Sequence, residues 1–288
     1  MQGENIKVHY KPIEPLHKYP FPWDKYAFFD VFPEVRLGIP VSGISKIDFS
    51  DVQDADLVVV AGQSWYLSPS LPLQSFFLDS DVQDYLRGRK IVFVNGCRNM
   101  WLMTARKIRK YISDIGGTLV GHIVLQDPAA NLVSVLTIIR WLFYGKKEKS
   151  LLLPHSGVSR SDIAQSARFG LIIGKAVEAD NYDNLQSKLL TANAIEYKPG
   201  VIFIEKIGHR IFGLWANFIR RKGESGDLRR RKWLMLFAAY LVVVLYIVSP
   251  FVSLFFYLTY PFRHISQDRI NDCTNLSTLS SKELKTII

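Results

Sequence analysis

The chain has 288 residues, of which 48% are hydrophobic and 22% charged, so we expect a packed domain and exclude disorder along the whole chain. Only two cysteines occur, Cys97 and Cys273, which excludes a disulfide framework and favours a reducing cytosol. The net charge of +10 is concentrated between residues 220 and 232, where seven basic residues face two acidic ones, so nucleic acid is not the expected partner.

Four β-rich runs precede residue 130, and we expect each to form a strand: residues 6–10, 57–61, 91–94 and 119–125. The second and third are continuous apolar runs that end in glycine, which is typical of strands buried on both faces of a parallel sheet. Residues 100–115 carry apolar side chains at helical spacing and stop at a Gly-Gly pair. This alternation predicts an α/β fold with a parallel sheet.

Two loops with polar and aromatic residues follow the second and third runs, where parallel sheets bind their ligands. Glycine lets a backbone approach a ligand, aromatic rings offer flat faces, and amides, hydroxyls and a guanidinium supply hydrogen bonds. A crevice for a planar heterocycle is predicted, although the same rings could instead plug the core. The candidate contacts are Gln63, Ser64, Trp65 and Tyr66 in the first loop, and Asn95, Gly96, Cys97, Arg98, Asn99 and Trp101 in the second.

The C-terminal part predicts attachment to a membrane. Residues 233–262 contain no charged residue and exceed the roughly 20 apolar residues that cross a bilayer. The basic cluster upstream indicates that the preceding domain faces the cytoplasm. A single crossing and a re-entrant turn at Pro250 both remain open.

Two further helices are predicted before the apolar run. Residues 201–221 place apolar side chains on one helical face, so this segment either lies on the bilayer or packs against the domain. Ser159 and Asp162 form a capping pair that starts a helix. We therefore divide the chain into a domain at 1–200, a basic juxtamembrane segment at 201–232, a membrane segment at 233–262 and a polar tail at 263–288. The apolar face of the juxtamembrane helix consists of Ile204, Ile207, Ile211, Leu214 and Phe218.

The layout of these segments resembles the flavodoxin-like NAD(P)H:quinone oxidoreductases and, more specifically, the dialkylresorcinol condensing enzyme family. The resemblance rests on DLVVVAGQSWYLSPSLPLQSFF (56–77) and KIVFVNGCRNMWLM (90–103), and it extends to YPFPWD (19–24), FFDVFPEVRLGIP (28–40), NLVSVLTIIRWLFYGKK (131–147) and the C-terminal apolar run. It implies a flavodoxin-like sheet, FMN as cofactor and a ketosynthase as partner. The implied reaction turns a lipid-like 2,5-dialkylcyclohexane-1,3-dione into the resorcinol of flexirubin-type pigments.

One element of the flavodoxin pattern is missing. Such chains begin with a strand and a Ser/Thr/Gly-rich loop that cradles the flavin phosphate through backbone N–H groups. Residues 6–10 resemble the second strand of that pattern, and no such loop precedes them. We therefore expect the domain to be N-terminally incomplete, with an unpaired sheet edge where the first strand would lie. The binding of FMN depends on that segment.

Arg98 and Tyr66 are the candidate catalytic residues that this resemblance suggests. Arg98 would stabilise an anionic enolate or a reduced flavin, while Trp65, Tyr66 and Trp101 would line the ring site. A role of Cys97 as a condensing nucleophile is disfavoured, because the histidines are scattered. Two alternatives remain open: a membrane-tethered quinone reductase, and a non-catalytic partner that docks the ketosynthase to the membrane. No metal-ligand spacing occurs in the sequence.

Overall fold

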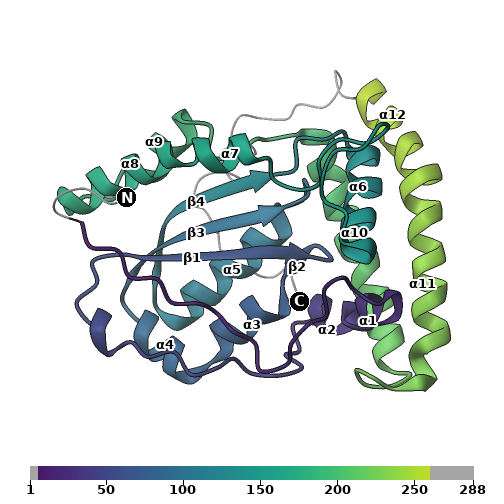
Figure 1. The fold of residues 1–288 in the computed structure, drawn as a ribbon, viewed down its shortest axis with the longest axis horizontal. Helices are drawn as coiled ribbons and strands as arrows, with labels where there is room; N and C mark the ends of the chain where they lie inside the picture. Colours follow the sequence, from purple (N-terminus) through teal and green to yellow (C-terminus); the bar gives the residue numbers. More distant parts are fainter. Residues whose placement is uncertain (1–5, 260–288) are drawn as a thin grey trace.

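A four-stranded sheet of order β2-β1-β3-β4 forms the centre of the structure, a computed structural model that describes residues 6–259 (Figure 1). β1, β3 and β4 are parallel, and the short β2 returns antiparallel to β1. The predictions of an α/β fold and of strands at 57–61, 91–94 and 119–125 are confirmed. The strand bounds are β1 Val58–Trp65, β2 Ser68–Pro69, β3 Lys90–Cys97 and β4 Thr118–Gln126.

The prediction of a strand at residues 6–10 is wrong. This segment is irregular, and downstream of it only an isolated bridge joins Pro15 to Ile44. The side chains of His9 and Lys11 bind the carboxylate of Asp51 at 3.1 and 2.6 Å. A β-rich run forms a strand only where it lies against a partner strand, and local pattern does not contain that information.

The outer edge of β1 is the open side of this sheet. β3 pairs with β1 from Val58 to Gln63, whereas β2 covers the other side only at Ser64 and Trp65. Within residues 6–259 no strand pairs with the remainder of that edge. Side chains alternate along β1, so that Val60 is 3% exposed and Val59 is 37% exposed.

Helices cover both faces of the sheet. On one face Val60 and Phe93 meet Phe77 of α3 and Ile108 and Ile112 of α5. On the other face Val92 and Ile123 meet α8 and α9 through a separate cluster that includes Phe169, Ile173 and Leu189. The helix bounds are α3 Leu71–Leu78, α4 Ser80–Leu86, α5 Leu102–Ile115, α8 Ala167–Glu178 and α9 Leu185–Thr191.

Two predicted helix boundaries agree with the structure. α5 ends at Gly116, which adopts a left-handed conformation with a φ of 84° that most side chains disfavour, and its N–H donates to the backbone oxygen of Ile112. α7 (Arg160–Gln165) begins at Ser159, whose hydroxyl accepts a hydrogen bond from the Asp162 N–H at 3.0 Å. The predicted capping pair is therefore confirmed.

A long apolar helix stands along one side of the molecule (Figure 1). The helical run Leu228–Thr259 has 32 residues and a mean hydropathy of 2.4, so its length and composition would allow it to cross a membrane. It consists of a 3-10 turn at Leu228–Arg230, α11 at Arg231–Val243, a π-helical segment at Val244–Val248 and α12 at Ser249–Thr259. The run continues past Pro250 without turning back. Residues 260–262 of the predicted membrane segment, and the predicted tail at 263–288, lie outside the described residues.

The predicted juxtamembrane helix is α10 (Pro199–Arg220), and it packs against the domain, which was one of the two alternatives. It lies between the sheet and the apolar helix (Figure 1) and starts within the segment that we assigned to the domain. Its buried face includes Ile202, Glu205 and Ala216, whereas Leu214 is 73% exposed. Because α10 is buried on a face other than the one we chose, the predicted apolar face only partly describes its packing.

A buried ion cluster fixes the base of the apolar helix to α1 (Lys25–Asp30) and α2 (Phe32–Leu37). Nε of Arg230 donates to Asp30 Oδ1 and Nη1 to Glu34 Oε1, both at 2.7 Å, and Nη2 also bonds the backbone oxygen of Asp30. Asp30 further accepts hydrogen bonds from Ser225 and Gly226. The Arg230 side chain is fully buried, so this cluster joins the helix to the domain rather than facing lipid.

Candidate functional site

The carboxyl ends of β1 and β3 lie side by side, as the sequence predicted for the two loops. Gln63 is opposite Gly96 in the parallel register, and the hydroxyl of Ser64 donates to Asn95 Oδ1 at 3.0 Å. Both strands point toward the side of the molecule that carries α6 (Asn131–Tyr144) and α10 (Figure 1). We therefore examine this edge of the sheet as the candidate site.

The two aromatic residues of the first loop pack into a hydrophobic cluster. Trp65 meets the rings of Tyr19 and Trp23 edge-on at 5.4 and 5.7 Å, and its Nε1 donates to Gln63 Oε1 at 3.2 Å. Tyr66 donates its hydroxyl to the backbone oxygen of Phe28 at 2.8 Å. Burial raises the pKa of the Tyr66 phenol well above its usual value, so it stays protonated. These contacts support the alternative that the rings plug the core.

The second loop directs Arg98 toward α6. Nη1 of Arg98 donates to the backbone oxygen of Asn131, to Asn131 Oδ1 and to the hydroxyl of Ser134 at 2.7, 2.7 and 2.8 Å. Asn99 donates to the same Asn131 Oδ1 at 2.7 Å. Burial lowers the pKa of Arg98 to about 10, an effect that the negative charge of Asp127 opposes. Arg98 is therefore a cation at neutral pH whose hydrogen-bond acceptors here are neutral groups.

Asp127 connects this loop to the chain beyond β4. Its N–H donates to the backbone oxygens of Cys97 and Arg98 at 3.2 and 2.9 Å. Its carboxylate accepts from the N–H groups of Ala129 and Gly157 at 2.9 and 2.8 Å. The carboxylate is thus occupied by backbone donors, and it acts on Arg98 through space rather than through a hydrogen bond.

Cys97 and Trp101 lie in the interior rather than at an open crevice. Trp101 is 1% exposed and contacts the ring of His122 at 5.7 Å, within a cluster that also contains Val124 and Ile202. Burial raises the pKa of the Cys97 thiol, and the nearby Glu205 raises it further. The thiol is therefore neutral, whereas a nucleophilic cysteine reacts as the thiolate.

Glu205 of α10 occupies the N-terminus of α5, a contact that no local sequence pattern predicts. Its Oε1 accepts a hydrogen bond from the N–H of Met103 at 2.8 Å, and the N–H groups of Leu102 and Trp101 also lower the pKa of the carboxyl group. Glu205 is fully buried, and burial raises its pKa to about 7 against the lowering effect of those N–H groups. Glu205 lies outside the apolar face predicted for this helix, yet it is among the buried residues of α10.

The apolar helix also reaches this site, at its π-helical segment. Tyr246 lies close enough to Arg98 for the two groups to interact electrostatically. The Tyr246 hydroxyl is buried and has no hydrogen-bond partner in the part of the chain that the structure describes. π-helical turns inside α-helices are frequent at functional sites, and this one lies beside the cation of the candidate site. Glu205 and Tyr246 are more than a hundred residues away from the loops in sequence, so no local motif could have indicated them.

The flavin phosphate does not fit the groups that the structure describes at this edge. A phosphate needs free backbone N–H groups at a helix N-terminus. The carboxylate of Glu205 already fills the N-terminus of α5, and the carboxylate of Asp127 lies just before α6. A carboxyl group therefore lies at the start of α5 and another shortly before α6, where an anionic ligand would bind. Among residues 6–259, no cluster of three His, Cys, Asp or Glu side chains could hold a metal ion.

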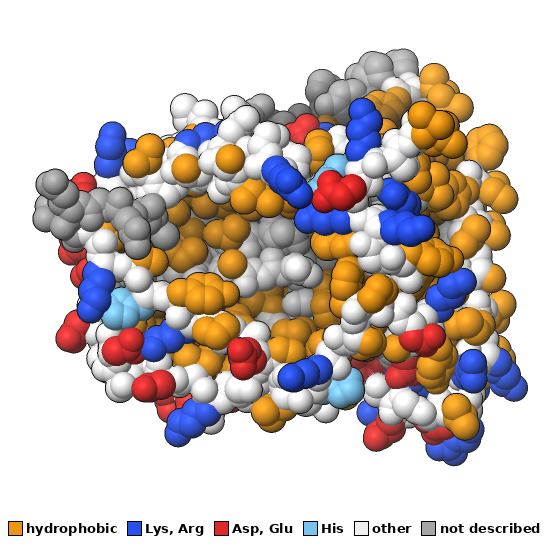
Figure 2. All heavy atoms as spheres, in the orientation of Figure 1, with side chains coloured by type: hydrophobic (Ala, Val, Ile, Leu, Met, Phe, Trp, Pro, Cys, Tyr) orange, Lys and Arg blue, Asp and Glu red, His pale blue; other side chains and the backbone are white. Residues whose placement is uncertain are grey.

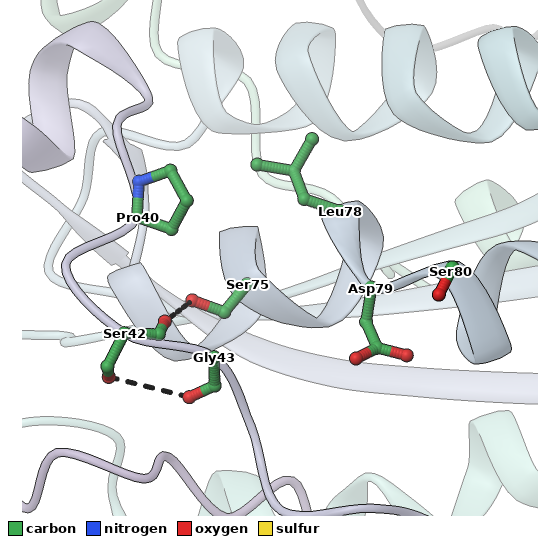
Figure 3. A pocket seen from close by; sticks show the side chains of 7 residues that line it. All are labelled: Pro40, Ser42, Gly43, Ser75, Leu78, Asp79 and Ser80. Atoms are coloured by element: carbon green, nitrogen blue, oxygen red, sulfur yellow. Dashed lines mark hydrogen bonds between the residues drawn. The ribbon is translucent and has the colours of Figure 1, made fainter.

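A pocket of about 440 Å³ lies elsewhere, beside the start of α4 (Figure 3). Its polar groups are already used within the fold: the Ser75 hydroxyl donates to the backbone oxygen of Ser42 at 2.7 Å, and Asp79 accepts the N–H of Val82. The pocket contains none of the predicted site residues. Its remaining lining residues are Pro40, Gly43, Leu78 and Ser80.

The structure thus brings the two predicted loops together but divides their side chains among separate environments. Gln63 is exposed, and Ser64 and Gly96 are partly exposed, whereas Asn95 and Asn99 are buried. Arg98 alone combines a charge, neutral hydrogen-bond acceptors and a neighbour on the apolar helix.

No protein-family model matches the chain, and no curated protein or solved structure matches it either.

Proposed function

We propose that this protein acts at a membrane in dialkylresorcinol synthesis, where Arg98 binds the enolate of a lipid-like 2,5-dialkylcyclohexane-1,3-dione. The observation that carries the proposal is a buried guanidinium, held by the neutral acceptors Asn131 and Ser134, beside Tyr246 of an apolar helix. A 1,3-dione loses a proton readily, and its enolate would replace neutral acceptors with an anionic one. Alkyl chains on the ring would pack along the apolar helix.

The order of the parallel strands supports the flavodoxin-like part of the proposal. β1, β3 and β4 follow one another in space as the third, fourth and fifth strands of a flavodoxin-like sheet would. The open edge of β1 is where the first strand of that arrangement would pair. We accordingly assign the domain to the cytoplasmic side of the membrane, next to the basic residues that precede the apolar helix.

Aromatisation of a cyclohexane-1,3-dione removes two hydrogen atoms and requires an electron acceptor. FMN would supply this chemistry when bound, but the described residues do not provide its phosphate site. We therefore assign to the described residues the binding of the enolate and the exclusion of water from it, and to the ketosynthase the delivery of the ring. The absence of a fitting phosphate site favours a substrate-binding partner over the alternative of a membrane-tethered NAD(P)H:quinone reductase.

Titration of a synthetic dione against the purified protein in lipid nanodiscs tests this function, with the ultraviolet absorption of the enolate as the signal. Arg98→Gln should weaken binding about 10- to 100-fold, the range expected for one charged hydrogen-bonding partner, and Arg98→Lys should retain part of the affinity. Arg87→Gln is the control, since Arg87 is an exposed arginine paired with Asp84. Equal affinity of Arg98→Gln and the wild type would contradict the proposal.

The absorption spectrum of the same preparation separates the alternatives. We expect no flavin to remain bound to the protein of this sequence, because Glu205 and Asp127 stand at the two helix starts. A bound flavin together with NAD(P)H-dependent reduction of a simple quinone would instead establish the quinone reductase.

A further inference from the structure

The apolar helix contacts the domain at its base, its middle and its far end. At the base, Phe237 stacks on Phe32 with ring centroids 3.9 Å apart. In the middle, Tyr246 approaches Arg98. Near the end, Phe256 contacts Phe203 of α10 at 5.1 Å. The helix therefore packs against the domain along its whole length and does not lead away from it.

This packing is incompatible with a helix that crosses a bilayer. In a crossing helix the middle lies roughly 15 Å from each membrane surface, in the centre of the hydrocarbon. Arg98 would then be drawn to that depth, together with the exposed Lys206 and Arg210 of the neighbouring α10. Charged side chains at the centre of a bilayer are strongly unfavourable.

The side of the helix that faces away from the domain is apolar from end to end. Figure 2 shows hydrophobic side chains along the edge of the molecule that α11 and α12 form, with Lys and Arg gathered near its lower end. Exposed Arg221, Lys222, Arg231 and Lys232 lie at the base of the helix. The outward residues are 39–69% exposed, and they are Met235, Leu236, Val242, Val243, Ile247, Val248, Phe251, Leu254, Phe255, Tyr257 and Leu258.

We propose that the helix Leu228–Thr259 lies in the plane of a membrane surface and does not cross it, with its outward apolar face inserted into an anionic lipid leaflet. The domain covers one face of the helix, so only the outward apolar face would insert, to about 5–10 Å as in interfacial helices, at the boundary between headgroups and acyl chains. The basic residues at its base then contact anionic headgroups. The inference rests on the membrane association proposed above but not on the identity of the ligand.

This arrangement directs the candidate site toward lipid. The strands end on the side of the molecule that α10 and the apolar helix occupy, so the sheet's carboxyl edge faces the membrane (Figure 1). A lipid-like molecule in the same leaflet reaches Arg98 by passing beside Tyr246, without entering water. A helix that does not cross the membrane leaves both of its ends on the side that carries the domain.

Labelling with a membrane-impermeant maleimide tests the location of the tail. The probes are the native Cys273 and a cysteine introduced by Ser113→Cys on the exposed surface of α5, while the native Cys97 is buried. In sealed vesicles whose outer surface carries the domain, as shown by full labelling of the Ser113→Cys variant, we expect Cys273 to be labelled equally. Protection of Cys273 until detergent is added would overturn the proposal.

The depth of the outward face gives a second readout that does not depend on the tail. Environment-sensitive fluorophores are attached, in a Cys273→Ser background, through Val243→Cys, Ile247→Cys or Leu254→Cys, and are quenched by lipids labelled at defined acyl positions. An in-plane helix gives one shallow depth for all three, whereas a maximum near the middle of the helix would overturn the proposal.

Failure of the wild type to bind anionic vesicles, with dimers formed instead, would overturn membrane docking itself. Loss of dione binding alone would affect only the proposed function.

Discussion

Glu205 and Arg230 are both buried charged residues, and the fold satisfies them in different ways. Arg230 forms ion pairs with Asp30 and Glu34, so its charge is compensated. Glu205 accepts hydrogen bonds from backbone N–H groups and interacts electrostatically with Arg106, and its second oxygen, Oε2, has no hydrogen-bond partner in the described part of the chain. The sequence could not separate these cases, because Arg230 stands among exposed basic residues and Glu205 lies on a helix with a regular apolar pattern.

The raised pKa of Glu205 makes the stability of the folded protein depend on pH. The folded state holds the proton up to about pH 7, whereas an unfolded Glu releases it near pH 4.5. Because the folded state binds more protons between these values, the free energy of unfolding falls as pH rises from about 4.5 to 7, by roughly 3 kcal/mol in total. Glu205→Gln removes the charge but keeps an oxygen for Met103.

Chemical denaturation in mild detergent at pH 5, 6, 7 and 8 measures this effect. We expect a smaller decline of stability with pH in Glu205→Gln than in the wild type. Glu224→Gln is a matched control on an exposed glutamate whose pair with Arg220 lies at the surface. Identical pH profiles in the wild type and Glu205→Gln would show that Glu205 is ionised without penalty.

At the scale of elements, local pattern was sufficient where an element depends on its own residues. The buried strands, the glycine that ends α5 and the cap at Ser159 follow from apolar runs, left-handed glycine and side-chain capping. Residues 6–10 have the composition of a strand but pair with no strand in the described part of the chain. The face of α10 was assigned incorrectly because α2, α5 and the apolar helix contact it from several directions.

β1 offers a test of its two faces through two adjacent valines, whose side chains point to opposite sides of the sheet. Val59→Thr should change the free energy of unfolding by less than about 0.5 kcal/mol, because Val59 is 37% exposed. Val60→Thr is the same change of side chain, but it buries a hydroxyl in the core, where Val60 is 3% exposed. It should therefore lower the free energy of unfolding by about 1–3 kcal/mol. Denaturant midpoints of the two variants measure the difference. Equal losses would mean that another segment covers the outer face of β1 in solution.

For the whole molecule, the adjacency of the two loops was predictable, but their environment was not. Parallel neighbouring strands necessarily bring their carboxyl ends together. The rings that enclose Trp65 come from residues 19–32, and the groups beside Arg98 come from α6 and from the π-helical segment. These long-range contacts determine that Trp65 packs in a cluster and that Arg98 lies next to the apolar helix.

The basic residues at the base of the apolar helix should govern its preference for anionic lipid. Arg221, Arg231 and Lys232 are exposed, and each basic residue near an anionic surface contributes about 1 kcal/mol. Replacing all three with Gln should therefore weaken binding to anionic vesicles by about 100-fold. Flotation of the protein with vesicles, at lipid concentrations below saturation, measures this change.

Vesicles of zwitterionic lipid provide the matched control, because the outward apolar face remains intact in the triple variant. On those vesicles the variant and the wild type should bind equally, and added salt should lower wild-type binding to anionic vesicles toward that of the variant. Arg230 is left unchanged, since its charge is held by Asp30 and Glu34 inside the protein. If the triple variant bound anionic vesicles as well as the wild type, the apolar face alone would determine membrane binding, and charge would not select the leaflet.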